Sequence, residues 1–250
     1  MESPHFERAV TSKNIIITGA SRGFGKAIAE KFSANGYQIY LSSRSDTALY
    51  QAMEELQTKY PNANIKAKPF DLSVKEQAKR LGEWILSLGI SVDILVNNAG
   101  AFVGGNIYEE QDSTLEKMIE TNLYSAYHLT KTLLPKMMRQ DLSSGSRGHI
   151  FNMCSIASLK AYPNGGSYSI SKFALAGFSK NLREEMKQYF IKVTAVYPGA
   201  AFTDSWIGSG VDEKRIMEAR DVAEMIFAAA QLSPQATVED IVLRPQLGDL

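Results

Sequence analysis

The order of segments along the chain is the feature that most constrains its fold. Short apolar runs rich in β-branched and aromatic residues alternate with longer runs of helical period. Seven strands are predicted, at residues 14–19, 37–43, 65–71, 93–100, 149–155, 192–199 and 240–245. Six helices are predicted between them, at residues 24–35, 46–59, 73–88, 113–140, 168–189 and 220–232. Strict alternation of this kind predicts an α/β fold, with a doubly wound parallel sheet of about seven strands and helices on both faces.

Length and composition narrow the class of protein further. The 250 residues, 44% of them hydrophobic, suffice for one sizeable core, so a single domain over residues 1–250 is expected. Lysine plus arginine (27) balance aspartate plus glutamate (27), so no net charge recruits nucleic acid or an anionic membrane. No apolar run approaches the ~20 residues of a membrane helix. A small molecule is therefore the expected partner.

Cysteine, histidine and the first residues bear on metals and location. Cys154 is the single cysteine, and the three histidines are scattered without the spacing of metal ligands, so no metal is expected. Cys154 precedes Ser155 on a predicted buried strand, which favours a packing thiol. The segment "MESPHFERAV" lacks the apolar run of a signal peptide, so a cytoplasmic location is expected.

The first predicted strand ends in the glycine-rich segment "TGASRGFG" at residues 18–25. Glycine at positions 19, 23 and 25 lets the backbone turn sharply and approach a diphosphate, and the following helix offers unpaired N–H groups at its N-terminus. A nucleotide is a natural ligand for such a turn. By itself the segment is also compatible with a tight strand-to-helix connection that binds nothing.

The end of the second strand, "LSSRS", indicates which dinucleotide would fit. NAD-binding folds place an acidic residue about 20 positions after the glycines, whereas a basic residue there accommodates the 2′-phosphate of NADP. Ser43 stands at this end, Arg44 follows it, and Arg22 in the glycine turn could reach the same phosphate. This favours NADP(H), although Arg44 alone would also suit an exposed loop.

The segment "YSISK" at residues 168–172 carries the strongest chemical signal. Tyr168 and Lys172 are four residues apart and share a helix face, so the lysine can lower the pKa of the phenol. Tyr168 could then exchange a proton with a carbonyl or alcohol oxygen, and Ser155, at the end of the fifth strand, could bond the same oxygen. Separately the three residues would suit a core aromatic, a solvated cation and a strand-end hydroxyl. Together they favour catalysis.

These segments, with "NNAG" at 97–100, Asn122 and "PGAAFT" at 198–203, resemble the short-chain dehydrogenase/reductase family in order and spacing, over essentially the whole chain. The resemblance implies a Rossmann-type fold and an NADP(H)-dependent oxidoreductase that acts on CH–OH groups, with hydride carried by the nicotinamide. It also implies that Lys172 binds the nicotinamide ribose, that Asn122 supports a water-linked proton relay, and that the protein forms a homodimer or homotetramer. Asn122 could instead bond between helices.

The resemblance also implies a set of residues in contact with the cofactor. These are Gly19, Ser21, Arg22, Gly23, Phe24, Gly25, Ser43, Arg44, Asp71, Asn98, Ala99, Gly100, Tyr168, Lys172, Pro198, Gly199 and Thr203. Asp71 would lie beside the adenine ring, although a helix N-cap is almost as good an interpretation of this aspartate.

The substrate is less constrained. "YPGAAFTDSW" at 197–206 and "VEDIVLRPQLGD" at 238–249 resemble bacterial sepiapterin reductases, and the general frame also resembles 3-oxoacyl-acyl-carrier-protein reductases. Tyr162, Phe202 and Trp206 are expected to line the substrate pocket, where they could stack on a flat carbonyl compound. Asp204 could pair with a pterin or cap a loop. An alternative of another class is a non-catalytic NADP(H)-sensing protein, which would be expected to have lost Tyr168 or Lys172.

Overall fold

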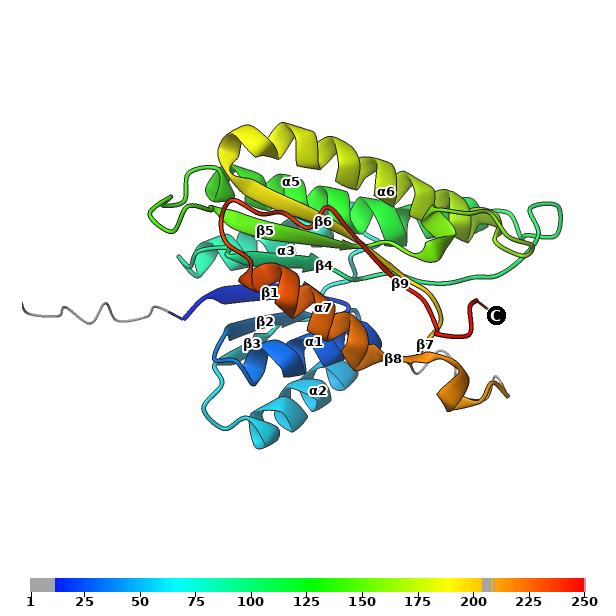
Figure 1. Ribbon diagram of the computed structural model, residues 1–250, viewed down its shortest axis with the longest axis horizontal. Coiled ribbons are helices and arrows are strands. Elements are labelled where there is room, and N and C mark those ends of the chain that lie inside the picture. The colour runs from blue at the N-terminus through cyan, green and yellow to red at the C-terminus, as the bar shows by residue number, and fades with distance from the viewer. Residues whose placement is uncertain (1–11, 204–207, 209, 250) are drawn as a thin grey trace, which may run out of the picture.

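Seven parallel strands form one sheet in the computed structural model, which describes residues 12–203, 208 and 210–249. The order across the sheet is β3-β2-β1-β4-β5-β6-β9 (Figure 1). The strands are β1 (Asn14–Thr18), β2 (Gln38–Ser42), β3 (Ile65–Ala67), β4 (Ile94–Asn97), β5 (Gly148–Met153), β6 (Ile191–Pro198) and β9 (Asp240–Leu243). The prediction of a doubly wound parallel sheet is confirmed.

Helices connect the strands and cover both faces of the sheet (Figure 1). They are α1 (Gly23–Ser33), α2 (Asp46–Lys59), α3 (Lys75–Ser87), α4 (Thr114–Ile119), α5 (Ser125–Met137), α6 (Gly166–Met186) and α7 (Ala219–Gln231). Short helical turns add η1 (Glu120–Tyr124), η2 (Ile156–Ser158), η3 (Lys187–Tyr189) and η5 (Glu213–Arg215). None of the helices in the described part of the chain is long and apolar enough to cross a bilayer.

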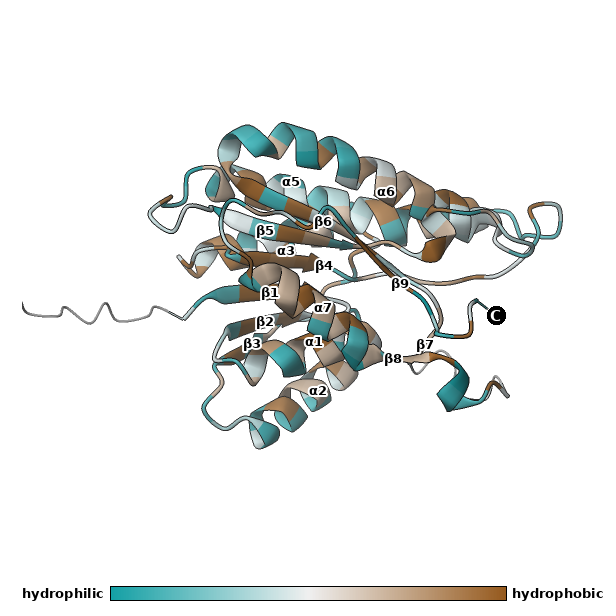
Figure 2. Ribbon diagram, viewed as in Figure 1, coloured by the Kyte–Doolittle hydropathy of each residue, from teal (hydrophilic) through white to brown (hydrophobic). Residues whose placement is uncertain are grey.

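The two faces of the sheet carry separate apolar layers. Ile15 and Ile17 of β1 pack in the layer of α1, α2 and α7, whereas Ile16, between them, packs in the layer of α3, α5 and α6. Because successive side chains point to opposite faces, a strand covered on both sides must be apolar throughout. Figure 2 shows hydrophobic colouring along the central strands for this reason. Each fully buried isoleucine contributes roughly 1.5–3 kcal/mol of stabilisation.

The strand order reverses at the carboxyl ends of β1 and β4. The chain runs outward from β1 through β2 to β3 and then crosses to β4, on the other side of β1. The loops after β1 and β4 therefore depart in opposite directions from the carboxyl ends of neighbouring strands. In open parallel sheets this is where ligands bind.

Three elements differ from the sequence prediction. The helix predicted over residues 113–140 is divided into α4, the π-helical turn η1 and α5, because the Asn122 side chain bonds both backbone groups of Ala101. The predicted strand 65–71 is regular only over Ile65–Ala67, although the N–H groups of Lys68 and Phe70 still donate to Leu41 and Ser43. A small parallel pair, β7 (Ala201–Phe202) with β8 (Met217–Glu218), lies in a region for which no strand was predicted.

Candidate active site

The glycine turn between β1 and α1 has the backbone shape predicted for a phosphate cradle. Gly19 and Gly23 adopt positive φ angles of 62° and 55°, which glycine tolerates best. A Cβ atom on Gly25 would lie 2.3 Å from the carbonyl oxygen of Gly19, so only glycine allows this close approach. Arg22, the N-cap residue of α1, makes no capping bond with its side chain. The open helix N-terminus and the close glycine backbone fit a dinucleotide phosphate.

The loop after β4 is fastened to this turn by Thr18 and Asn98. The Thr18 hydroxyl accepts the N–H groups of Asn98 (3.0 Å) and Ala99 (2.9 Å). The Asn98 amide donates to the carbonyl oxygens of Thr18 (2.9 Å) and Gly19 (3.0 Å). Asn98 therefore holds the cradle in shape through its side chain. Gly100, two residues on, is exposed.

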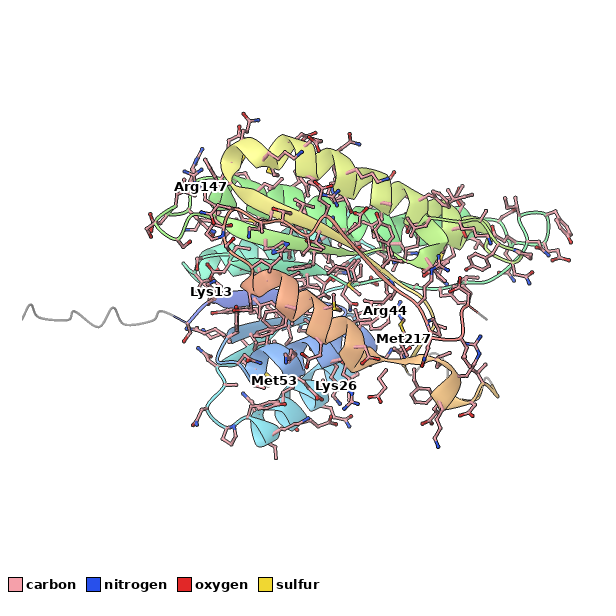
Figure 3. The ribbon with its side chains drawn as sticks, in the orientation of Figure 1. Lys13, Lys26, Arg44, Met53, Arg147 and Met217 are labelled. Atoms are coloured by element: carbon pink, nitrogen blue, oxygen red, sulfur yellow. The ribbon has the colours of Figure 1, made fainter. Side chains whose placement is uncertain are left out.

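Ser43 and Arg44 follow the carboxyl end of β2. Ser43 is buried, and its hydroxyl donates to the carbonyl oxygen of Ser45 at 3.2 Å. Arg44 is exposed and lies toward the opposite end of the strands from Lys13 and Arg147 (Figure 3). Arg22 is exposed as well, and neither Arg22 nor Arg44 makes an ion pair within the described residues. Both guanidinium groups are therefore available to a phosphate.

Tyr168, Lys172 and Ser155 come together where α6 crosses the end of β5. Lys172 is 6% exposed, and its Nζ donates to the carbonyl oxygen of Met153 at 2.8 Å and lies 5.8 Å from the centre of the Tyr168 ring. Burial lowers the pKa of Lys172 to about 8. Ser155 starts η2, where its Oγ accepts the N–H of Ala157 at 3.1 Å. The Ser155 side chain faces the Tyr168 hydroxyl and acts to lower the pKa of that phenol.

The protonation of Tyr168 differs from the sequence argument. Lys172 was expected to lower the pKa of the phenol, but in the structure burial raises the pKa of Tyr168, and the nearby Ser155 side chain opposes this only in part. The reason is geometric, because the Lys172 ammonium bonds the Met153 carbonyl and lies over the ring. Tyr168 is consequently protonated at neutral pH, the state that a proton donor needs.

Asn122 lies beneath the loop that follows Gly100. Its Oδ1 accepts the N–H of Ala101 at 2.7 Å, and its Nδ2 donates to the Ala101 carbonyl (3.0 Å) and to Ser171 Oγ (2.9 Å). A Cβ on Gly100 would lie 3.1 Å from Asn122 Oδ1 and 3.6 Å from Lys172 Nζ. Asn122 thus bonds between helical elements, the alternative considered from the sequence, and it does so next to Lys172.

The remaining predicted cofactor residues also lie at or after the carboxyl ends of strands. Asp71 Oδ1 accepts the N–H (3.1 Å) and hydroxyl (2.7 Å) of Ser73, so it stabilises a turn, while the N-cap of α3 is Val74. The loop after β6 approaches the glycine turn, since a Cβ on Gly23 would lie 3.4 Å from Thr203 Cγ2. Pro198 ends β6, and the N–H of Gly199 donates to the Leu243 carbonyl at 2.8 Å.

The predicted substrate pocket is described only in part. Tyr162 is 41% exposed after η2, and Phe202 lies in β7, whereas Trp206 and Asp204 are outside the described residues. Phe102 was not predicted. Its ring contacts the Tyr168 ring edge to face at 4.8 Å, yet it remains 61% exposed. The only sequence signal was an aromatic residue two positions after "NNAG".

Cys154 directly precedes Ser155 but is suited to packing rather than to this chemistry. Burial raises the pKa of the Cys154 thiol to about 11, which suits a packing role. No group of three histidine, cysteine, aspartate or glutamate side chains that could hold a metal ion occurs among the described residues.

Comparison with known proteins identifies the family. Residues 13–213 match the family model described as short chain dehydrogenase. The chain therefore belongs to the short-chain dehydrogenase family of oxidoreductases.

Individual relatives match most of the chain at modest identity. The chain is 34% identical over 230 residues to dehydrogenase/reductase SDR family member 7B of Xenopus laevis, covering 86% of this chain and 70% of that protein. The alcohol dehydrogenase of the archaeon Thermococcus sibiricus, solved with 5-hydroxy-NADP, has a TM-score of 0.85 and 25% identity, with 96% and 99% of the two chains covered. L-sorbose reductase of Gluconobacter frateurii, solved with NADPH and L-sorbose, has a TM-score of 0.83 and 26% identity, with 94% and 95% covered.

Proposed function

We propose that this protein is an NADPH-dependent carbonyl reductase that converts a ketone or aldehyde to an alcohol. The observation that carries the proposal is the group of the buried Ser155 and Lys172 with the half-buried Tyr168, which lies at the same carboxyl ends of the strands as the glycine cradle. A protonated phenol beside a serine hydroxyl is suited to a carbonyl oxygen that gains charge.

The cradle and the two arginines would hold the cofactor. The N-terminus of α1 would bind the pyrophosphate, and Arg22 and Arg44 would bind the 2′-phosphate beside Ser43, which stands where an aspartate would repel it. The NADP and NADPH complexes of the related structures support this choice over NAD. When bound, the nicotinamide supplies the hydride that no side chain can provide.

The side chains of this chain would then handle the proton and the developing charge. Tyr168 donates the proton of its hydroxyl to the carbonyl oxygen, and Ser155 donates a hydrogen bond to the same oxygen. The Lys172 ammonium, held by the Met153 carbonyl 5.8 Å from the centre of the Tyr168 ring, binds the nicotinamide ribose. Asn122 holds Ala101 beside Lys172, which keeps the wall of the site in place.

The substrate would lie against aromatic side chains. Phe102, in contact with Tyr168, supplies one exposed ring, and Tyr162 and Phe202 are proposed as further walls. Rings of this kind can stack on a flat heterocycle, which supports a pterin ketone of the sepiapterin type as the first substrate to try. An apolar wall also accepts an acyl thioester, as in a 3-oxoacyl-carrier-protein reductase.

A panel of carbonyl compounds tests the proposal. NADPH oxidation would be followed by nicotinamide absorbance with sepiapterin, a diketone, an acetoacetyl thioester and a simple aldehyde. Efficient turnover of sepiapterin alone supports the pterin branch, and preference for the thioester supports the acyl-chain branch. Tight NADPH binding with no turnover of any carbonyl contradicts the reductase and favours an NADP(H)-sensing protein.

We further propose that the protein is a homodimer or homotetramer that works in the cytoplasm, where its buried thiol stays reduced. The helical elements η1, α5 and α6 expose large apolar side chains, which a second copy would cover. These are Tyr124, Tyr127, Ile170 and Phe173, each between 40% and 46% exposed.

A further inference from the structure

The helix that carries Tyr168 and Lys172 is capped by a residue from another part of the chain. Gly165, the N-cap residue of α6, has no side chain to offer. The N–H of Ser167 instead donates to Glu110 Oε1 at 2.8 Å, and the Ser167 hydroxyl bonds the other carboxylate oxygen. Ser167 is 2% exposed. Glu110 therefore satisfies a buried N–H in the first turn of α6 and places a negative charge at the positive end of the helix.

The backbone around this contact leaves room only for the carboxylate. Gly166 has a φ of +32°, and a Cβ there would lie 2.1 Å from Glu110 Oε1 and 2.5 Å from the Gly105 carbonyl oxygen. A second contact joins the same two segments, because the N–H of Gly105 donates to the Asn164 carbonyl at 3.0 Å. The N–H of Asn164 in turn donates to Asn106 Oδ1 at 3.3 Å, so the loop of residues 101–110 is fastened to the start of α6 at three points.

The other end of this loop reaches the candidate active site. Ala101 is held by both polar atoms of the Asn122 amide, and the Phe102 ring contacts the Tyr168 ring at 4.8 Å. Tyr168 is the residue directly after Ser167. The loop of residues 101–110 therefore bonds the backbone next to Tyr168 through Glu110 and contacts the Tyr168 ring through Phe102.

We propose that Glu110 is a positioning residue that fixes the first turn of α6 and, with it, the Tyr168 hydroxyl and the Phe102 ring. This inference rests on the proposed function, since it assigns the purpose of the contact to the reaction. Two consecutive glycines precede Ser167, and among the described side chains only that of Glu110 bonds the Ser167 N–H. Removing the carboxylate therefore removes this bond. The first turn then frays, and the phenol samples positions from which proton transfer is slow.

The test uses the full-length protein with three substitutions. Glu110→Ala removes the cap, Glu110→Gln keeps an oxygen that can accept from Ser167, and Asp112→Ala removes an exposed carboxylate two residues further along the same loop. Hydrogen exchange of the peptide covering residues 162–172 reports on the helix turn without any substrate. NADPH titration counts the folded sites, so that kcat can be given per binding site.

Glu110→Ala should speed exchange in residues 162–172 and lower kcat per site by about ten- to one hundredfold, as expected for a displaced catalytic group. NADPH affinity should stay within about threefold of wild type, because the cradle lies on β1 and α1. Glu110→Gln should recover most of kcat, and Asp112→Ala should match wild type. Unchanged exchange in Glu110→Ala, or faster exchange with an unchanged kcat per site, would overturn the proposal.

Gly166→Ala provides an independent variant, because its methyl group would displace the Glu110 carboxylate. It should reproduce both effects of Glu110→Ala, and a wild-type exchange pattern in this variant would also count against the proposal. The two proposals can fail separately. A wild-type protein that binds NADPH and reduces no carbonyl refutes the proposed function, whereas an active wild type with an equally active Glu110→Ala refutes only the role of Glu110.

Discussion

Arg44 is the residue on which the proposed choice of cofactor depends most. It is exposed and follows the buried Ser43 at the carboxyl end of β2, and β2 pairs with β1, which leads into the glycine turn that contains Arg22. A phosphate there would gain charge-assisted hydrogen bonds that the ribose hydroxyl of NAD cannot offer to the same degree. The Ser43 hydroxyl is already bonded to Ser45, so the arginines carry the discrimination.

Arg44→Asp should therefore reverse the preference from NADPH to NADH. The substitution removes a charged hydrogen-bond donor and adds a repelling carboxylate, so the ratio of kcat/KM for NADPH over NADH should fall by about a hundredfold or more. Steady-state kinetics with both cofactors measures this ratio. Lys13→Asp is the matched control, because Lys13 lies at the opposite end of the sheet (Figure 3). An unchanged ratio in Arg44→Asp would place the 2′-phosphate elsewhere.

Single residues differ in how far the sequence could predict them. Tyr168 and Lys172 were predictable because a spacing of four on a helix fixes a shared face. Phe102 and Glu110 were not, because their contacts join segments 57 or more residues apart and depend on the course of an irregular loop. The direction of the Lys172 ammonium was also not predictable, since it follows from the position of the Met153 carbonyl.

Strand β5 buries the titratable side chain of His149 inside the sheet. His149 is 5% exposed, stacks on Phe151 at 3.9 Å and lies 2.7 Å from Thr194 Oγ1 through its Nε2. The Thr194 hydroxyl donates its proton to the Val238 carbonyl, so Nε2 of His149 must be the donor in the bond with Thr194. Burial, with the charge of Lys192, lowers the pKa of His149 to about 3.

Because of His149, the free energy of unfolding should fall at pH values well above those at which carboxylates titrate. In the unfolded chain the imidazole protonates near pH 6.5, whereas in the folded chain it stays neutral down to about pH 3. The contribution of His149 to the free energy of unfolding is therefore fully present above pH 6.5. It is lost as the pH falls, by about 2 kcal/mol between pH 7.5 and 5. Urea unfolding at the two pH values measures the difference in the free energy of unfolding.

The controls for this prediction are two glutamine variants. His149→Gln should lose about 2 kcal/mol of the pH dependence. His128→Gln should keep most of it, because His128 is only partly buried. Equal pH dependence in wild type and His149→Gln would show that the histidine is not the responsible group.

The elements themselves were mostly predictable, with instructive exceptions. Apolar runs and helical periods located every strand of the main sheet and every long connecting helix. The π-helical turn at Glu120–Tyr124 was missed because it arises from the bonds of Asn122 to Ala101, which periodicity does not record. The pair β7–β8 was missed because two-residue strands leave no repeating pattern.

At the scale of the whole molecule, one sheet supports two surfaces with different tasks. The glycine cradle, the two arginines and the group of Ser155, Tyr168 and Lys172 lie at the carboxyl ends of the strands. The outer faces of η1, α5 and α6 carry exposed aromatic and aliphatic side chains. The order of strands and their crossing point could be expected from the alternation of elements. Which helix faces remain uncovered could not, because that depends on how the layers pack.

Introducing a charge on this surface should therefore separate the subunits. Phe173→Glu places a carboxylate on the exposed face of α6, so the molar mass from light scattering after size exclusion should fall to that of one chain. Leu86→Glu, on the exposed face of α3, is the matched control and should leave the assembly intact. A wild type that is already monomeric, or an unaffected Phe173→Glu assembly, would contradict the proposed surface.

The most direct test of the central claim compares NADPH binding and turnover in wild type, Tyr168→Phe and Tyr162→Phe, with the best carbonyl substrate of the panel. Tyr168→Phe keeps the ring that packs on Phe102 and loses only the hydroxyl, so NADPH should bind as tightly as before while kcat falls by about a hundred- to ten-thousandfold. Tyr162→Phe should retain turnover within about tenfold. Wild-type turnover in Tyr168→Phe would contradict the assignment of the proton donor and, with it, the proposed mechanism.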